Sequence, residues 1–232
     1  MKSVSKKIGR MNEAAWLLGI LLCALGVALC TKASFGLSMI AAPPYILHLK
    51  ISQFLPWYTQ GTSEYIWQFF LLVLTCLAVQ RIRWQYLLSF GTGILFGFSL
   101  DGWLWLLGGG APYETLLARI LAYAAGSLLT GFAVAFFFRT KLPLEIYELT
   151  VAEIADRYKL PIHRVKQVYD ISMLAIAILF ALFLMGGFTG IGIGTAITTL
   201  INTTLITLCG KLLDRVFTFE PRFPSFTEQL SQ

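Results

Sequence analysis

The sequence predicts an all-α integral membrane protein with six transmembrane helices, arranged as a 3+3 inverted repeat with an interfacial or broken helix in each half. Three observations lead to this fold class: the composition, six long apolar runs, and the alternation of basic connections. Hydrophobic residues make up 57% of the 232 residues and charged residues only 13%, which is not the composition of a soluble domain. We therefore expect one membrane domain over residues 1–232, with no soluble domain attached.

The lengths of the apolar runs predict the individual spans. A helix needs about 20 mostly apolar residues to cross the hydrocarbon core, because the core is about 30 Å thick and each residue rises about 1.5 Å. Runs of this kind, bounded by charged or turn residues, predict spans near residues 14–32, 64–80, 86–108, 115–138, 167–187 and 190–213. A polar tail follows over residues 216–232.

Two of the connections are too long and too apolar for ordinary loops. Ala33–Ser63 contains three prolines and is expected to form a short helix that lies at the membrane or dips into it. In Arg139–Lys166, apolar residues alternate with acidic ones, a pattern typical of an amphipathic helix at the membrane interface. Each half of the chain therefore contains one such segment after its first span.

The positions of Lys and Arg predict the orientation, since basic connections stay on the cytoplasmic side. These residues gather in the N-terminal segment, in the second and fourth connections and at the C-terminal end, which all alternate onto one side. The connections on the opposite side hold only Lys32 and Lys50. Both termini are therefore predicted to be cytoplasmic. The first span is not expected to be a cleaved signal peptide, because no cleavage site with the usual pair of small residues follows it. The same bias explains the net charge of +6 without any binding of nucleic acid.

The sequence carries no motif of a membrane enzyme or of a metal site. HExxH, GxSxG and paired-Cys motifs are absent, so we expect no enzymatic activity, no catalytic residue, no metal and no cofactor. All four cysteines fall in apolar runs, which favours small buried thiols over disulfides or zinc ligands. They are Cys23, Cys30, Cys76 and Cys209.

The two halves of the chain resemble each other weakly. At an offset of 105, Gly26–Leu29 falls on Gly131–Val134 and Leu55–Pro56 on Leu160–Pro161, and at an offset of 103, Gly91–Thr92 falls on Gly194–Thr195. An offset of 109 competes near the interfacial segments. The order of parts also repeats over residues 14–108 and 115–213, and because each half holds three spans, the second half must be inverted. Inverted repeats are frequent in secondary transporters, although duplication that only produced a stable bundle stays open as an alternative.

Polar side chains within the spans are candidates for binding a solute, because polar groups are costly in a membrane and are usually kept there for a function. Thr195, Thr199 and Asn202 lie on the sixth span, and Thr92 and Ser99 form the corresponding pair on the third. Two such faces meeting at the repeat axis would line a polar substrate-binding cavity. The alternative is structural, since hydroxyls also bond to the carbonyls of their own helix and join neighbouring helices.

Three carboxylates, Glu64, Glu145 and Asp170, are candidates for ion or proton coupling. Glu64 opens the predicted second span and Asp170 the fifth, so they hold equivalent places in the two halves. If both point inward, they would bind a cation, a proton or a basic group. The structural alternative for Asp170 is a local ion pair with Lys166, four residues earlier. Asp101 is expected near the outer surface, in contact with water.

A glycine-rich run, Met185–Thr195, is the most distinctive local pattern. Its glycines either allow the backbone to approach a ligand closely or form a tight turn that starts a closely packed helix. The structural interpretation is slightly preferred.

Short motifs in the second half resemble a known family. Leu142–Glu145, Lys166–Asp170 and the glycine-rich run occur in the order seen in the YczE/YyaS/YitT group of bacterial multi-pass membrane proteins. Phe35–Ser38 replaces the Gly-Pro pattern of that group after the first span. The resemblance implies a six-span fold in the bacterial cytoplasmic (inner) membrane, and transport is a common supposition for the group.

The leading functional hypothesis is a small secondary transporter or permease for an unidentified solute, working by alternating access between inverted halves. The alternative is a non-transporting membrane component, such as a substrate-capturing subunit or an accessory protein of a larger complex. The expected partners are the lipid bilayer and a small solute, with a homo-oligomer or a partner subunit left open and no nucleic acid.

Overall fold

The structure is a computed structural model that describes residues 12–140 and 142–216. Within these ranges the chain forms eight helices and no strand, which confirms the all-α prediction. They are α1 (Asn12–Ala33), α2 (Ala42–Ile51), α3 (Gln60–Val79), α4 (Trp84–Leu106), α5 (Leu116–Thr140), α6 (Ile146–Tyr158), α7 (Ile162–Met185) and α8 (Ile193–Val216). The six helices other than α2 and α6 are long and apolar enough to cross a membrane, as predicted. The basic N-terminal segment and the polar tail lie outside the described residues.

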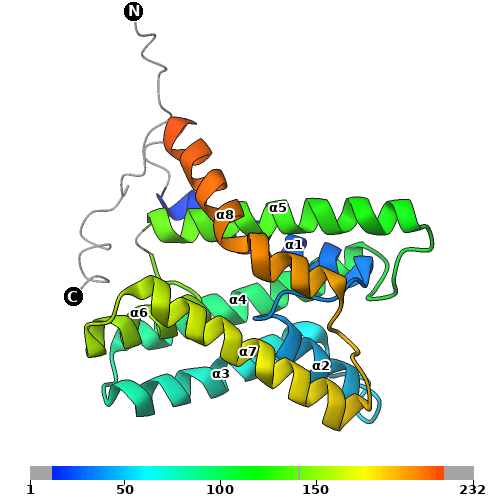
Figure 1. The fold of residues 1–232 in the computed structure, drawn as a ribbon, viewed down its shortest axis with the longest axis horizontal. Coiled ribbons are helices and arrows are strands. Elements are labelled where there is room, and N and C mark those ends of the chain that lie inside the picture. The colour runs from blue at the N-terminus through cyan, green and yellow to red at the C-terminus, as the bar shows by residue number, and fades with distance from the viewer. Residues whose placement is uncertain (1–11, 141, 217–232) are drawn as a thin grey trace, which may run out of the picture.

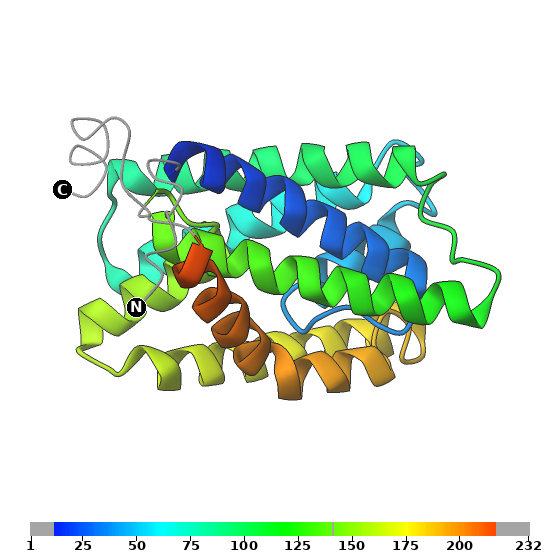
Figure 2. The ribbon, with the colours of Figure 1, turned by 90° about the horizontal axis from the view of Figure 1, so that it is seen from above.

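Most of the long helices run along the length of the bundle, with α8 inclined to them, and the two short helices lie at opposite ends (Figure 1). The order of one long, one short and two long helices occurs twice, as α1–α4 and as α5–α8. The first turn of α1 and the last turn of α8 both lie at the end that holds α6 (Figure 2). This arrangement is the one expected for a chain that crosses a membrane an even number of times.

Two spans begin earlier than their charged residues suggest. α3 begins at Gln60 because the Thr59 side chain accepts the backbone N–H of Thr62 at 3.0 Å and caps the helix. Glu64 therefore does not open the span but lies in its second turn. α7 begins at Ile162, right after Pro161, so Asp170 lies about two turns inside the helix.

The sequence predicts that Asp101 is in contact with water, but in the structure its carboxylate also forms hydrogen bonds with α3. Its Oδ1 accepts the backbone N–H of Gly61 at 2.8 Å and its Oδ2 accepts the Thr59 hydroxyl at 2.6 Å. The carboxylate of α4 thus binds the N-terminal turn of α3, where the unpaired N–H groups and the helix dipole favour a negative charge.

The contact between α1 and α5 is the most extensive in the bundle, and Figure 2 shows the two helices side by side. Gly26 and Gly126 allow this close approach: a Cβ added to Gly26 would lie 2.7 Å from the carbonyl oxygen of Gly126. Small residues bring helix backbones together in membranes in the same way. The central core therefore forms where the first helices of the two halves cross.

The glycine-rich run forms the turn between α7 and α8 and docks on the segment that follows α1. Gly190 accepts the backbone N–H of Leu37 at 3.2 Å, and Gly194 donates its N–H to the Phe35 carbonyl at 2.8 Å. The Thr195 hydroxyl donates to the Leu37 carbonyl at 2.6 Å. The structural interpretation of the run as a tight, closely packed turn is therefore confirmed, and the turn joins the two halves.

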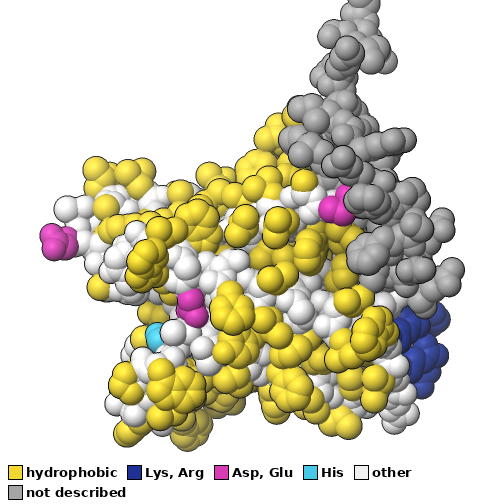
Figure 3. All heavy atoms as spheres, turned by 180° about the vertical axis from the view of Figure 1, so that it is seen from behind, with side chains coloured by type: hydrophobic (Ala, Val, Ile, Leu, Met, Phe, Trp, Pro, Cys, Tyr) yellow, Lys and Arg dark blue, Asp and Glu magenta, His cyan; other side chains and the backbone are white. Residues whose placement is uncertain are grey.

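Hydrophobic side chains cover most of the face drawn in Figure 3, while Lys and Arg gather at the end where Figure 1 places α6. Large apolar side chains such as Leu77, Phe98 and Phe183 are exposed along the long helices. An apolar belt of this extent is unfavourable in water but is the surface that a lipid bilayer requires. The molecule is thus a helical membrane protein.

Candidate functional site

A cavity of about 110 Å³ lies in the middle of the bundle. All six long helices and α6 contribute side chains to its wall, so both halves of the chain enclose it. The volume is enough for several water molecules or a small solute. We call this space the central cavity.

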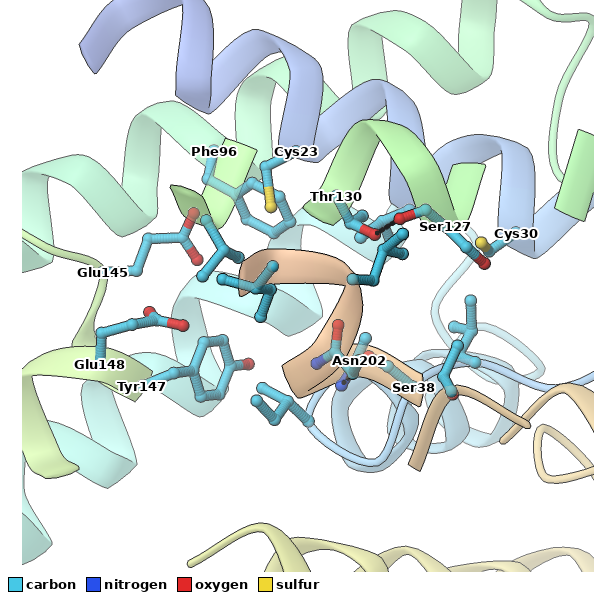
Figure 4. A pocket seen from close by; sticks show the side chains of 18 of the residues that line it. Cys23, Cys30, Ser38, Phe96, Ser127, Thr130, Glu145, Tyr147, Glu148 and Asn202 are labelled. Carbon is cyan, nitrogen blue, oxygen red and sulfur yellow. Dashed lines mark hydrogen bonds between the residues drawn. The ribbon is translucent and has the colours of Figure 1, made fainter. Parts of the chain in front are cut away.

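Three buried carboxylates form one end of the central cavity. Glu64 comes from α3, Glu145 precedes α6 and Glu148 lies in its first turn; their exposed fractions are 1%, 4% and 8%. The Tyr147 hydroxyl donates to Oε2 of Glu64 at 2.9 Å. In Figure 4 the side chains of Glu145, Tyr147 and Glu148 all point toward the space beside Asn202.

The way α6 packs explains why two of these carboxylates face inward. Glu145 and Glu148 are three residues apart and therefore share one face of the helix. The hydroxyls of Thr75 and Thr150 lie 2.7 Å apart and hold α6 against α3. α6 was expected as an amphipathic helix at the interface; it is a short helix between the spans, but seven of its residues are buried and its first acidic residue faces the interior.

Burial in this wall makes the charged forms of the carboxylates costly. It raises the pKa of Glu145 well above its ordinary value, and the neighbouring charges of Glu148 and Glu64 raise that pKa further. Burial also raises the pKa of Glu148, although the Lys166 ammonium opposes the shift. The cluster therefore tends to hold protons or requires a compensating cation.

Asp170 does not join this cluster. Its Oδ1 lies 2.7 Å from Nζ of Lys166, so the predicted local ion pair is confirmed. Lys166 lines the central cavity, whereas Asp170 does not. The two carboxylates that the repeat places at equivalent positions, Glu64 and Asp170, thus have different surroundings.

The predicted hydroxyl cluster of the sixth span is only partly in the cavity. Asn202 lines it and is half-buried. Thr195 donates to the Leu37 carbonyl and Thr199 to the Thr195 carbonyl at 2.7 Å, and neither lines the cavity. Thr198, one position away, does line it.

The structure does not bring the predicted pair of the third span to the central cavity. Thr92 is buried, with its hydroxyl 3.3 Å from the Pro143 carbonyl, and lines a separate apolar cavity beside Trp16. Ser99 donates to the carbonyl of Leu95 in its own helix. The reason is that α4 packs on α1, α3 and α6, and not extensively on α8, so the two polar faces do not meet.

Several cavity residues were not assigned a role from the sequence. Glu148 and Tyr147 carry a usable signal, because Glu148 repeats the inward face of Glu145 one turn later. Ser127 and Thr130 on α5 line the opposite wall, and hydroxyls alone do not distinguish a cavity from a helix contact. Within residues 12–140 and 142–216, no three His, Cys, Asp or Glu side chains lie close enough to share a metal ion.

Comparison with known sequences places the chain in a family. The model of a family described as "Family of unknown function (DUF6198)" matches residues 11–211. The chain belongs to the DUF6198 family. All residues of the central cavity fall within the DUF6198 match.

A curated relative agrees with this assignment. The chain is 26% identical over 206 residues to a protein of Bacillus subtilis (strain 168), "Uncharacterized protein YyaS", covering 86% of this chain and 92% of the relative. The predicted resemblance to a YyaS-like group is thereby confirmed. No solved structure matches the chain.

Proposed function

We propose that this DUF6198 protein is a small secondary transporter that moves a small solute by alternating access, and that it is not an enzyme. One observation carries the proposal: a cavity between the two halves holds three carboxylates buried in a membrane bundle. Ionisable groups buried inside a membrane protein are expensive and usually mark the path of a solute or proton.

The packing of the helices supports two related, inverted halves. If α1–α4 is exchanged with α5–α8, the contact of α1 with α4 becomes that of α5 with α8, and both occur. The contacts α2 with α3 and α6 with α7 correspond in the same way, as do α2 with α7 and α6 with α3. The short helices at opposite ends of the bundle agree with inversion (Figure 1). A site between inverted halves is the usual plan of secondary transporters.

Two contacts break this correspondence. α4 packs on α6, whereas α8 and α2 form no comparable contact in the described residues. α3 and α4 pack along each other, whereas α7 and α8 form no comparable contact in the described residues and lie apart on either side of the turn that joins them (Figure 1). In alternating access, one half closes as the other opens. The difference supports a state that is closed between α3 and α4 and open between α7 and α8.

We further propose the bacterial cytoplasmic membrane as the location, with both chain termini in the cytoplasm. Arg81 and Arg83 follow α3, and Arg157 and Lys159 end α6, at the end of the bundle that also holds the first turn of α1. The positive-inside rule assigns this basic end to the cytoplasm.

Solute uptake into proteoliposomes tests the transport proposal. The variants Glu64→Gln and Glu148→Gln keep the size of the side chain but remove its charge, and Glu114→Gln, in the exposed α4–α5 connection, is the matched control. We expect the cavity variants to lower flux about tenfold or more, because a charge-assisted hydrogen bond contributes about 1.5–3 kcal/mol, and the control to keep it. Transport is rejected if a broad solute screen gives no flux above empty liposomes.

A non-transporting component of a larger complex is the second candidate. The observation that favours it is the exposure of α7 and α8: 22% of their most apolar stretch is buried, against at least 39% in the other four spans. A partner subunit would cover these helices. The mass of the complex extracted in mild detergent separates the candidates, since a stoichiometric second chain together with no flux in its absence favours the component.

A further inference from the structure

The charges around the central cavity are not balanced by the protein. Glu64, Glu145 and Glu148 line it, and among the described lining residues Lys166 is the single Lys or Arg. Its Nζ is already paired with Asp170 at 2.7 Å. A cavity of this sign disfavours anions and favours a positively charged occupant.

Polar atoms in the cavity wall also lack hydrogen-bond partners. Oε1 of Glu64 and Oε1 of Glu145 are buried, and neither has a partner in the described part of the chain. Buried polar atoms are normally paired. When a cation occupies the cavity and these carboxylates are ionised, their oxygens only accept hydrogen bonds, so the partner that they need is a donor.

The rest of the wall suits a hydrocarbon group. Phe96, Val134, Leu205 and Ile206 line the cavity together with the acidic end. A bare metal cation is a poor fit to this wall, since hard cations require about six oxygen ligands and no metal-binding group of three side chains occurs in the described residues. An occupant with one cationic end and one apolar end matches both parts of the wall.

We propose that the central cavity binds a small organic ammonium ion, a protonated primary or secondary amine with a short hydrocarbon body. Its N–H groups donate to the unpaired oxygens of Glu64 and Glu145, and its carbon atoms pack on the apolar side chains beside Phe96. The inference deepens the proposed transport function and rests on it for the biological role of binding. The binding itself is measurable without transport.

Binding to the purified full-length protein in detergent tests the proposal, with n-propylammonium as the probe. Calorimetry should give saturable binding with one site, and little or no binding of three comparison ions: tetramethylammonium, which has no N–H donor, sodium, and the anion propionate. Glu64→Gln and Glu145→Gln should each weaken binding about tenfold or more, since each removes a charged acceptor, and Glu114→Gln should not change it. Gel filtration identifies variants that fail to fold. If a variant does not fold, the selectivity of the wild type among the four ions still tests whether the cavity binds an organic ammonium ion.

The results separate this inference from the transport proposal. Saturable amine binding without any flux rejects transport and leaves the ligand class intact. Flux of a neutral or anionic solute without amine binding rejects the ligand class and leaves transport intact. The inference also fails if tetramethylammonium binds as tightly as propylammonium, or if the cavity variants bind as the wild type does.

Discussion

Replacing Gly26 by alanine tests the close crossing of α1 and α5. This crossing is a main contact between the two proposed halves. The added Cβ would lie 2.6 Å from Cγ2 of Thr130 and 2.7 Å from the Gly126 carbonyl oxygen, whereas ordinary contacts are 3.4–4 Å. The threonine can rotate, but the carbonyl belongs to the backbone of α5, so the helices must separate by several tenths of an ångström. Overpacking of this kind costs about 1–3 kcal/mol, and the better helix propensity of alanine offsets up to about 1 kcal/mol.

We therefore expect Gly26→Ala to lose about 0–2 kcal/mol of stability once the full offset is subtracted from the cost of overpacking, and to be about 1–3 kcal/mol less stable than an alanine variant without the clash. Gly91→Ala is the matched control, because it lies inside α4 and its new Cβ would meet no atom within 4 Å. The control should keep or slightly raise stability. Unfolding in a titration with a denaturing detergent, followed by the helical circular dichroism signal, measures both. Equal stability of the two variants would refute the close crossing.

Two further predictions concern the acidic cluster and the docking turn. Burial raises the pKa of Glu148 above its ordinary value of 4.5, so the folded protein keeps a proton that the unfolded chain releases. The unfolding temperature should therefore fall as pH rises above 4.5, and Glu148→Gln should make this dependence on pH weaker. If the variant shows the same dependence on pH as the wild type, Glu148 is not buried as described. Gly36 has a φ of +96°, and a Cβ added to it would clash with the backbone of Gly192, whereas a Cβ added to Gly109, with a φ of +85°, would meet open space. Thermal unfolding should therefore show a larger loss of stability for Gly36→Ala than for Gly109→Ala. Equal losses of stability would mean that only the backbone conformation matters.

The six spans could be predicted because a helix can cross the bilayer when its apolar run is long enough, whatever its neighbours are. Length and composition identify a spanning helix, and all six predicted spans occur, with ends displaced by a few residues. The Lys166–Asp170 pair was equally accessible, because residues four apart on a helix are always neighbours. Local geometry settles both features.

The position of polar side chains relative to the cavity could not be predicted in the same way. A hydroxyl inside a span can donate to a carbonyl of its own helix, as Ser99 and Thr199 do, so its presence gives no information about the neighbouring helix. An ionised carboxylate has no such internal donor in the helix and must find a partner elsewhere. Glu64 and Glu145 were therefore better indicators of the site than Thr92 or Thr195.

The chemistry of the central cavity is also compatible with the proposed duplication. If the offset of 105 holds in this part of the chain, where 109 competes with it, Glu145 corresponds to Ile40, and both residues line the cavity. Equivalent positions of the two proposed halves thus face the same space but present an acid in one half and a hydrocarbon in the other. A symmetric dimer of identical halves would have placed two carboxylates or two isoleucines there. Divergence after the proposed duplication, by contrast, would produce a wall with one acidic and one apolar part, which is the surface that the proposed organic ammonium ion requires.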